Sequence, residues 1–492
     1  MTTAPETVAP IVPPDDRLPG LSRSDRTLIG LLVFSAFVVI LNETVMSLAL
    51  PRLMADLNIS AATGQWLTTG FLLVMAVVIP ATGYIMERFT LRQIFVAAMS
   101  LFSAGTAIAA VAPGFELLLL GRIVQAGGTG VMMPLVMTTA MTLVPAHARG
   151  RIMGVISIVI SVAPAIGPTI SGLVLSRLSW RWLFLVVLPI ALLTLALGAW
   201  KVRNITTPRQ AHLDVVSLVL SAIGFGGLIY GLSSLGEAAG HAPVAPWIPV
   251  VAGLVALGLF VWRQRALQNG RGPLMDLRVF AHRSFTVSLL VLVTGFVGLF
   301  GALILLPIYL QNVHGTGTLE AGLLVLPGGV AMGVLSPVIG RLYDRFGPRP
   351  LVTPGTIALS AGLWLLSTAG PETSLVLVVL YHVLLTSGLA TLITPLMTAA
   401  LGALPTELYG HGSAIIGTLQ QLGGAAGTAL FITVLSKTTA ARMADGAGTL
   451  SATTDGIQAA FVWGGVVSLV AIAISLLVRR TEPADGVRVP VH

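Results

Sequence analysis

The sequence contains no cysteine and few charged residues, and both absences exclude whole classes of protein. Without cysteine, disulfide scaffolds, thiolate nucleophiles and cysteine-ligated metals are excluded. Only 9% of the 492 residues are charged, whereas a soluble protein carries about a quarter. Since 55% of the residues are hydrophobic, the composition predicts an all-α protein that crosses a membrane many times.

Lysine is almost absent as well. Only Lys201 and Lys437 occur, so the sequence has no Gly-x-x-x-x-Gly-Lys-Ser/Thr loop for binding nucleotide phosphates. The eight histidines are scattered and no His-Glu-x-x-His pattern occurs, so no metal site is indicated. No segment between the apolar runs is long enough for a soluble catalytic domain. We therefore expect a protein that is not an enzyme and that needs no cofactor.

Fourteen apolar segments of membrane-spanning length follow a polar, proline-rich tail. This tail, residues 1–26, has no signal-peptide pattern and is predicted to be disordered. The segments lie at about 27–50, 65–86, 92–112, 115–143, 152–176, 182–200, 213–235, 246–262, 284–310, 319–340, 350–369, 374–396, 411–436 and 457–478.

The basic residues are concentrated in alternate connections. Of the 27 lysine and arginine residues, 21 lie in one set of connections and the two tails, and five lie in the opposite set. Because cytoplasmic loops carry the excess of positive charge, both termini are predicted to be cytoplasmic. The same distribution accounts for the net charge of +8 without a nucleic-acid partner. The preference for arginine over lysine suggests a GC-rich bacterium. We therefore expect the protein in the lipid bilayer of a bacterial cytoplasmic membrane. We also expect it to be a monomer.

The two ends of the chain repeat one another at an offset of about 260 residues. The stretch from Gly83 to Phe89 matches that from Gly340 to Phe346, and Gly150 corresponds to Gly410. A parallel repeat of six segments is typical of the major facilitator architecture. It predicts a six-helix bundle at 27–200, an inserted helix pair with its linkers at 201–282, a second bundle at 283–478 and a cytoplasmic tail at 479–492.

Several motifs resemble those of one transporter family. They are the loop from Gly83 to Arg92, the stretch from Gly121 to Gly130, the proline-containing stretch from Ala163 to Gly172, and Trp180 to Phe184. In this order and spacing, the chain is identified as a member of the fourteen-helix drug:proton antiporter family of the major facilitator superfamily. The likeness covers nearly the whole chain.

The first apolar segment departs from the family's usual Leu-Asp-x-Thr motif. Here Asn42 occupies the usual position of the acid and Glu43 carries the charge. This pattern, together with the stretch from His411 to Gly424, resembles the branch of lincomycin-resistance exporters. The resemblance implies proton-coupled export of amphipathic, drug-like small molecules by alternating access, with the proton as coupling ion.

Other functions stay open at this stage. The same fold would suit a dedicated exporter of one metabolite, antibiotic or lipid. An uptake symporter is disfavoured by the resemblance of residues 163–172 to an antiporter motif. A membrane-embedded enzyme or sensor is the least favoured, because no nucleophile or metal constellation accompanies Glu43 and His382.

Glu43 is the only acid deep inside a predicted span. A carboxylate is costly to keep in hydrocarbon, so it marks a functional site by default. Arg122 is expected at a similar depth, in a helix that the resemblance places beside the first. We predict that Glu43, Arg122 and Asn42 form the proton-coupling group. A snorkelling Glu43, or a static buried pair with Arg122, remains possible.

Two further groups of residues are predicted to act in transport. The first shares polar, aromatic or thioether side chains within the spans, and is expected to line the substrate cavity unless these residues only pack the core: Trp66, Gln125, Met132, Met133, Tyr309, Gln311, His382, Gln420 and Gln421. The second carries the glycines, prolines and charges of the predicted gates, whose ion pairs would favour the outward-facing state or merely anchor the loops: Gly83, Glu87, Arg88, Pro164, Gly167, Pro168, Gly340, Asp344 and Arg345.

Overall fold

The computed structural model of the chain describes residues 21–59, 61–175, 177–205, 207–209, 212–235, 244–268 and 272–478. This part of the chain contains fourteen long helices, three short 3-10 helices and no strand. The long helices are α1 (Arg23–Leu57), α2 (Ala61–Arg88), α3 (Leu91–Ala110), α4 (Phe115–Leu143), α5 (Arg149–Leu175), α6 (Arg181–Lys201), α7 (Val215–Leu235), α8 (Trp247–Leu267), α9 (Arg283–Asn312), α10 (Thr318–Phe346), α11 (Arg349–Leu366), α12 (Leu375–Gly402), α13 (Tyr409–Ala444) and α14 (Thr449–Ser475). The short ones are η1 (Ala146–Ala148), η2 (Leu277–Ala281) and η3 (Thr406–Leu408).

The prediction of an all-α, multi-pass membrane protein is confirmed. Within the described residues, 13 helices are long and apolar enough to cross a membrane. The remaining long helix, α11, has 18 residues, and Arg349 and Pro350 at its start lower its mean hydropathy. It packs against α12 and α14. Each of the fourteen predicted apolar segments therefore corresponds to one helix.

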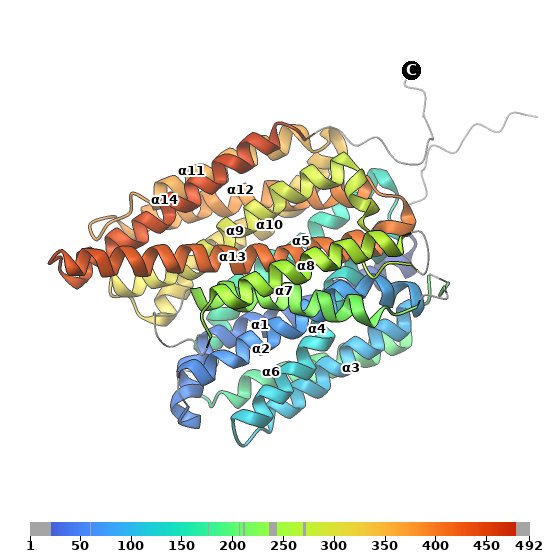
Figure 1. The fold of residues 1–492 in the computed structure, drawn as a ribbon, viewed down its shortest axis with the longest axis horizontal. Helices are drawn as coiled ribbons and strands as arrows, with labels where there is room; N and C mark the ends of the chain where they lie inside the picture. Colours follow the sequence, from blue (N-terminus) through green and yellow to red (C-terminus); the bar gives the residue numbers. More distant parts are fainter. Residues whose placement is uncertain are drawn as a thin grey trace, which may run out of the picture.

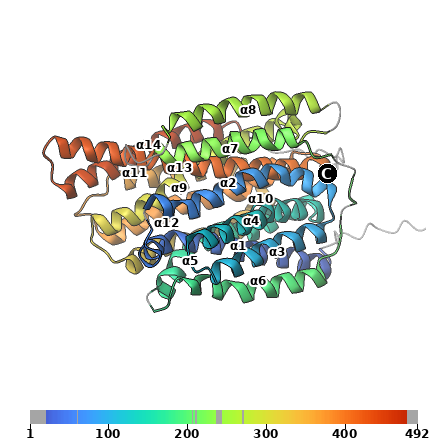
Figure 2. The same ribbon diagram turned by 60° about the horizontal axis from the view of Figure 1, so that its bottom comes forward.

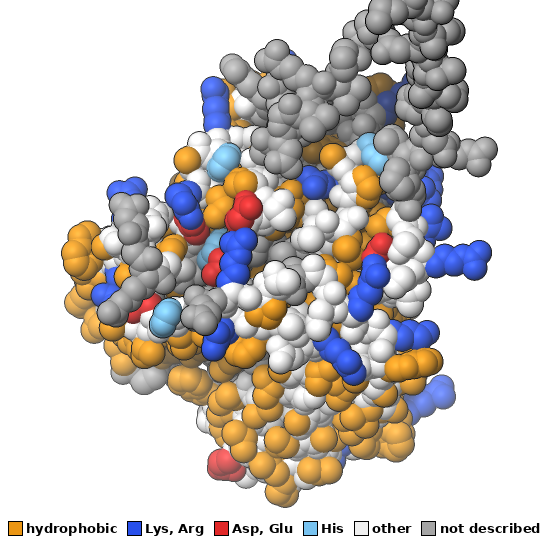
Figure 3. Space-filling view, turned by 90° about the vertical axis from the view of Figure 1, so that its right-hand side faces the viewer, with side chains coloured by type: hydrophobic (Ala, Val, Ile, Leu, Met, Phe, Trp, Pro, Cys, Tyr) orange, Lys and Arg blue, Asp and Glu red, His pale blue; other side chains and the backbone are white. Residues whose placement is uncertain are grey.

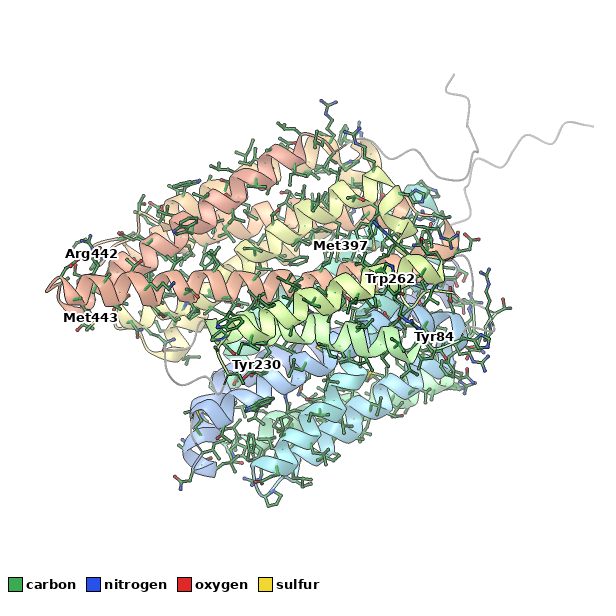
Figure 4. The ribbon with its side chains drawn as sticks, in the orientation of Figure 1. Tyr84, Tyr230, Trp262, Met397, Arg442 and Met443 are labelled. Atoms are coloured by element: carbon green, nitrogen blue, oxygen red, sulfur yellow. The ribbon has the colours of Figure 1, made fainter. Side chains whose placement is uncertain are left out.

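Two helices, α1 and α13, extend furthest beyond their predicted apolar segments. α1 begins at Arg23, inside the stretch predicted to be a disordered tail, because the Ser22 hydroxyl caps the Asp25 amide. It also runs through Pro51 and ends only at Asn58, which adopts a left-handed conformation. α13 continues to Ala444 and projects beyond its neighbours (Figure 1). The residues labelled Arg442 and Met443 in Figure 4 mark this tip. Residues 1–20 and 479–492 of the predicted tails lie outside the described part.

The helices pack in two sets that meet along the molecule. α1–α6 form one set and α9–α14 the other; in Figure 1 most of the first set lies below the second, and α5 passes behind it. The sets meet where α5 contacts α10 and α12, and where α2 and α4 contact α13. α7 contacts both α2 and α13, with α8 packed on its outer side (Figure 2). The division into units at 27–200, 201–282 and 283–478 stays a prediction, because packing alone does not define independent units.

One end of the molecule is rich in arginine. Figure 3 looks onto this end and shows many Lys and Arg side chains spread over it. We call it the basic end, and it contains the end of α2, the loop after α6 and the starts of α3, α5, α9 and α11, with residues Arg88, Arg92, Arg149, Arg151, Lys201, Arg203, Arg283 and Arg349. The first described turn of α1 and the last of α14 also lie there (Figure 1).

Candidate functional site

A cavity of about 150 Å³ lies between the two helix sets. Helices α1, α2, α4 and α5 line it on one side, and α9, α10, α12 and α13 line it on the other. Its wall is mainly apolar and rich in methionine, a flexible side chain that suits binding of varied ligands. The polar or ionisable lining residues are Glu43, Thr44, Thr129, His382, Thr386, Gln420 and Gln421.

The two polar residues of the α1 motif point in different directions. Glu43 lines the cavity, whereas Asn42 is buried and does not. The Asn42 Oδ1 atom instead accepts a hydrogen bond of 3.4 Å from Arg122 on α4. The two residues are neighbours on α1 and point about 100° apart, and the cavity lies on the side of Glu43. In this chain the acid is therefore the residue that faces the cavity.

Arg122 lies behind the cavity wall. Only 1% of it is exposed, and its guanidinium is held by neutral groups. It donates to Gln125 Oε1 at 2.7 Å and to the Leu67 carbonyl at 3.5 Å, and it lies 4.1 Å from the centre of the Phe71 ring. Among the described residues no ion pair within 4 Å joins it to Glu43. Arg122 is thus a fixed positive charge near the acid, without a close carboxylate partner.

Gln125 is itself held by α3. Its amide nitrogen donates to Thr106 Oγ1 at 2.8 Å, and the Thr106 hydroxyl donates to the Phe102 carbonyl at 2.6 Å. The two helices approach closely at Gly121, where the absence of a side chain leaves room: a β-carbon there would lie 2.8 Å from the α3 backbone. Thr106 was not among the predicted site residues, since nothing distinguishes this threonine from many others in the apolar segments.

Five of the nine predicted cavity residues line the cavity in this structure: Met132, Met133, His382, Gln420 and Gln421. Both glutamines take part although they are adjacent, and Gln421 donates to the Met75 sulfur at 3.6 Å. His382 is buried, its Nδ1 has no partner in the described structure, and its ring also bonds to the backbone of Val325.

The other four predicted cavity residues lie elsewhere. Gln125 is buried against Arg122, as described above. Trp66 is exposed, and its ring stacks on Tyr230 of α7 with the ring centres 6.1 Å apart. Tyr309 is buried and donates to the Gly370 carbonyl at 2.8 Å, and Gln311 near the end of α9 is not in the lining. Trp66, Tyr309 and Gln311 lie nearer the ends of α2 and α9 than the residues of those helices that line the cavity.

The basic end is closed where α5 crosses α10. The Asp344 carboxylate accepts hydrogen bonds from the Gly150 amide at 2.7 Å and from the Arg151 amide at 2.9 Å. These amides belong to the first turn of α5, where a carboxylate is favoured by the unpaired N–H groups and the helix dipole. Gly340 lies against the Gly150 carbonyl, where any side chain would collide with the backbone. We call this contact the α5/α10 crossing.

The second contact at the basic end joins α2 and α13. Glu87 Oε1 lies 3.2 Å from His411 Nε2, and the His411 side chain is 5% exposed. Gly83 makes room for the imidazole, because a β-carbon there would lie 2.5 Å from its Nδ1 atom. Gly410 packs against Met86 and the Gly83 α-carbon. We call this contact the α2/α13 crossing.

The predicted ion pairs of the gate loops do not occur among the described residues. Arg88 is exposed without an acidic partner, and Arg345 lies over the Phe346 ring at 5.1 Å. The acids Glu87 and Asp344 are used instead at the two crossings, because each faces the start of a helix of the other set.

The proline motif of α5 lies beside the site. Pro164 lines the cavity, and α5 continues as one helix through it. Gly167 allows α1 to approach, since a side chain there would collide with Thr44. The side chain of Pro168 lies outside the described part of the structure.

The model of the Major Facilitator Superfamily matches residues 32–428. The chain belongs to this superfamily. Membership shows a transporter family, and the resemblance noted from the motifs is confirmed. The Lincomycin resistance protein LmrB of Listeria monocytogenes is 40% identical over 92% of this chain and 97% of its own length. Its namesake from Bacillus subtilis is 39% identical over 92% and 95%. The Multidrug resistance protein B homolog of Mycobacterium tuberculosis is 30% identical over 83% and 75%.

Solved structures show the same fold at low identity. The human organic anion transporter MFSD10 superposes with a TM-score of 0.66 at 14% identity, covering 92% of this chain and 100% of that one. The proton:xylose symporter XylE superposes with a TM-score of 0.63 at 18% identity, covering 93% and 97%.

Proposed function

We propose that the protein is a drug:proton antiporter that exports amphipathic small molecules, antibiotics among them, by alternating access. The proposal rests on one observation. Among the described residues that line the cavity between the two helix sets, Glu43 is the only carboxylate. The names of the relatives, lincomycin resistance and multidrug resistance proteins, favour export of drugs over uptake.

The site supports coupling through competition for one carboxylate. A proton that reaches Glu43 from outside removes its charge and weakens the hold on a bound substrate, which leaves. Facing inward, an entering substrate favours the ionised Glu43, and the proton is released. Arg122 adds a fixed positive potential that favours the ionised form. Asn42 and Gln125 keep that charge in place.

Coupling to the membrane potential provides enough free energy for export. The basic end is assigned to the cytoplasm by the excess of positive charge, so protons move inward from the opposite end. One proton charge gains about 2.3 kcal/mol per 100 mV, which sustains a roughly 40-fold gradient of a neutral substrate. We propose one proton per cycle, and a monomer in a bacterial cytoplasmic membrane.

The decisive experiment measures proton release from the purified protein on addition of lincomycin, for the wild type beside Glu43→Gln. Wild-type protein should release protons on binding. Glu43→Gln should bind the compound and release none. Glu116→Gln is the matched control, because Glu116 lies at the start of α4, away from the cavity, and its replacement should change nothing.

Four results would contradict parts of this proposal. Release that persists in Glu43→Gln would exclude this residue as the coupling acid. Binding without release in the wild type would exclude a proton antiporter. Cells that accumulate the compound instead of losing it would identify an uptake symporter, and protection against a single compound class would identify a dedicated exporter.

A further inference from the structure

The α2/α13 crossing contains an ionisable group that the transport cycle above does not use. His411 is at the start of α13, and its Nε2 atom faces Glu87 Oε1 of α2 at 3.2 Å. Its Nδ1 atom is buried, points to Gly83 and has no partner in the described structure. The contact joins the two helix sets, so it exists only while the basic end is closed.

Charged groups from three other elements surround this imidazole. Glu87 comes from α2, and Asp276 precedes η2 on the other side. Burial alone would raise the pKa of Asp276. Hydrogen bonds from Arg278 outweigh this effect, and the charge of the nearby His411 adds to them, so the pKa lies below its ordinary value. Tyr409 precedes His411 by two residues. The guanidinium carbon of Arg149, on α5, lies 5.6 Å from the centre of the Tyr409 ring. His411 therefore faces the Glu87 carboxylate directly, while Asp276 is already paired with Arg278.

The α5/α10 crossing is made differently, through the ionisable carboxylate of Asp344, near which His147 lies. By the internal repeat Asp344 corresponds to Glu87, and Arg151 corresponds to His411. Asp344 binds the backbone amides of Gly150 and Arg151, and neither donor can gain or lose a proton at ordinary pH. Only the α2/α13 crossing is made through a side chain whose charge changes between about pH 5 and 8 in ordinary surroundings.

We propose that His411 is a second proton-binding site, which locks the α2/α13 crossing closed when the cytoplasm is acidic. In the neutral imidazole, Nε2–H donates to Glu87 and Nδ1 keeps its lone pair. A proton from cytoplasmic water, added at Nδ1 while the crossing is open, makes the ring a cation. Closure then forms an ion pair with Glu87 in the field of Asp276.

The direction follows from linkage. Only in the closed form can the cationic imidazole make an ion pair with the Glu87 carboxylate, 3.2 Å away. Closure is favoured at low pH and weakened as the pH rises. The proposal rests on the assignment of the basic end to the cytoplasm. An antiporter that carries protons inward would then be slowed by the acidity it produces, before the cell interior becomes harmful.

A distance measurement at the basic end tests this inference. Because the chain has no cysteine, Arg92→Cys on α3 and Arg349→Cys on α11, both exposed, can carry two spin labels without background. The labelled protein is placed in lipid nanodiscs in a Glu43→Gln background, so that protonation of Glu43 contributes nothing. Distances are recorded between pH 5.5 and 8.5. The ratio of open to closed molecules should rise roughly three- to tenfold across this range.

Substitutions at the crossing identify the group responsible. His411→Gln and Glu87→Gln should each abolish the pH dependence, and Gly83→Ala should hold the basic end open at every pH, because its methyl group occupies the place of the imidazole. Arg88→Gln, on the exposed side of the same turn, should leave the titration unchanged.

An unchanged titration in His411→Gln or in Glu87→Gln would overturn the proposal. So would a closed fraction that does not respond to pH in the labelled protein with His411 and Glu87 intact. Size-exclusion profiles separate these outcomes from misfolding. The readout needs no drug and no Glu43, so it stands or fails independently of the antiport proposal.

Discussion

The two crossings at the basic end pair equivalent glycines, but the backbones come closer at the α5/α10 crossing and the chemistry differs. In each, a glycine of α2 or α10 lies against a glycine of the first turn of α13 or α5, from the opposite helix set. At the α5/α10 crossing a carboxylate caps backbone amides, whereas at the α2/α13 crossing it meets an imidazole. The inserted helix α7 covers only the latter crossing. A repeated fold therefore provides two equivalent contacts of different chemistry, one through backbone amides and one through a histidine side chain.

The largest effect is expected from adding a methyl group at the glycine contact of the α5/α10 crossing. In Gly340→Ala the new methyl group would collide with the Gly150 carbonyl, and neither backbone can yield cheaply. Export should fall by more than about tenfold, measured as drug efflux from proteoliposomes. Gly322→Ala on the same helix is the control, since its β-carbon would lie 3.8 Å from Thr169 Oγ1, an ordinary contact. Equal losses in both variants would show that the close approach is unimportant.

Removal of the cap at the same crossing should have a smaller effect that does not vary with pH. Asp344→Asn keeps the shape but loses two charge-assisted hydrogen bonds. The open fraction should rise about tenfold at pH 6 and at pH 8 alike, measured by the label distance across the basic end. Asp445→Asn, exposed at the opposite end, should show no change. A rise at only one of the two pH values would mean that this crossing titrates as well.

Exchange of the histidine for the residue at the equivalent position should make the two crossings behave alike. His411→Arg keeps a positive charge at all pH values. At pH 8 the closed fraction should rise roughly threefold over the wild type, and at pH 6 the two should match. Efflux assays at both pH values provide a second readout. A variant that still titrates like the wild type would assign the pH response to another residue.

The smallest effect is expected from the inserted pair. Hydrogen bonds from Arg263 of α8 lower the pKa of Asp214, before α7, to about 2. The unfolded value is about 3.9, so the carboxylate stabilises the fold above pH 4 and this contribution is lost as the pH falls towards 2.

Asp214→Asn should therefore lower the free energy of unfolding by about 1 kcal/mol at pH 7. The difference from the wild type should vanish towards pH 2, as followed by thermal unfolding in detergent between pH 2 and 7. Export should stay within about twofold, because the pair covers one crossing only. Arg265→Gln, exposed on the same turn of α8, serves as control. A difference that persists at pH 2 would show that Asp214 stabilises the protein other than through its charge.

Much of the fold was predictable from the sequence because hydrocarbon allows few solutions. Apolar length located the helices, and charge asymmetry identified the basic end. Boundaries failed where polar groups continue a helix outside the membrane. Ser22 starts α1 early, and the pair of Arg442 with Asp455 at 2.8 Å accompanies the extension of α13.

The candidate site was predictable only in part. Glu43 and His382 stood out because ionisable groups are rare inside spans. Trp66 and Tyr309 do not line the cavity of this structure, since they lie nearer the ends of α2 and α9 than its lining residues do. His411 entered only through a family resemblance, and its pairing with Glu87 connects residues 324 positions apart.

The sequence by itself determined a fourteen-helix membrane transporter with one internal acid. Apolar length and charge are local properties, and they decide which segments are stable in the bilayer. Only the tertiary structure decided that Glu43 and not Asn42 faces the cavity. It also decided that Arg122 is held by amides, and that one crossing is made through a histidine. These facts depend on helix rotation and on contacts between distant segments, which packing against the whole bundle establishes.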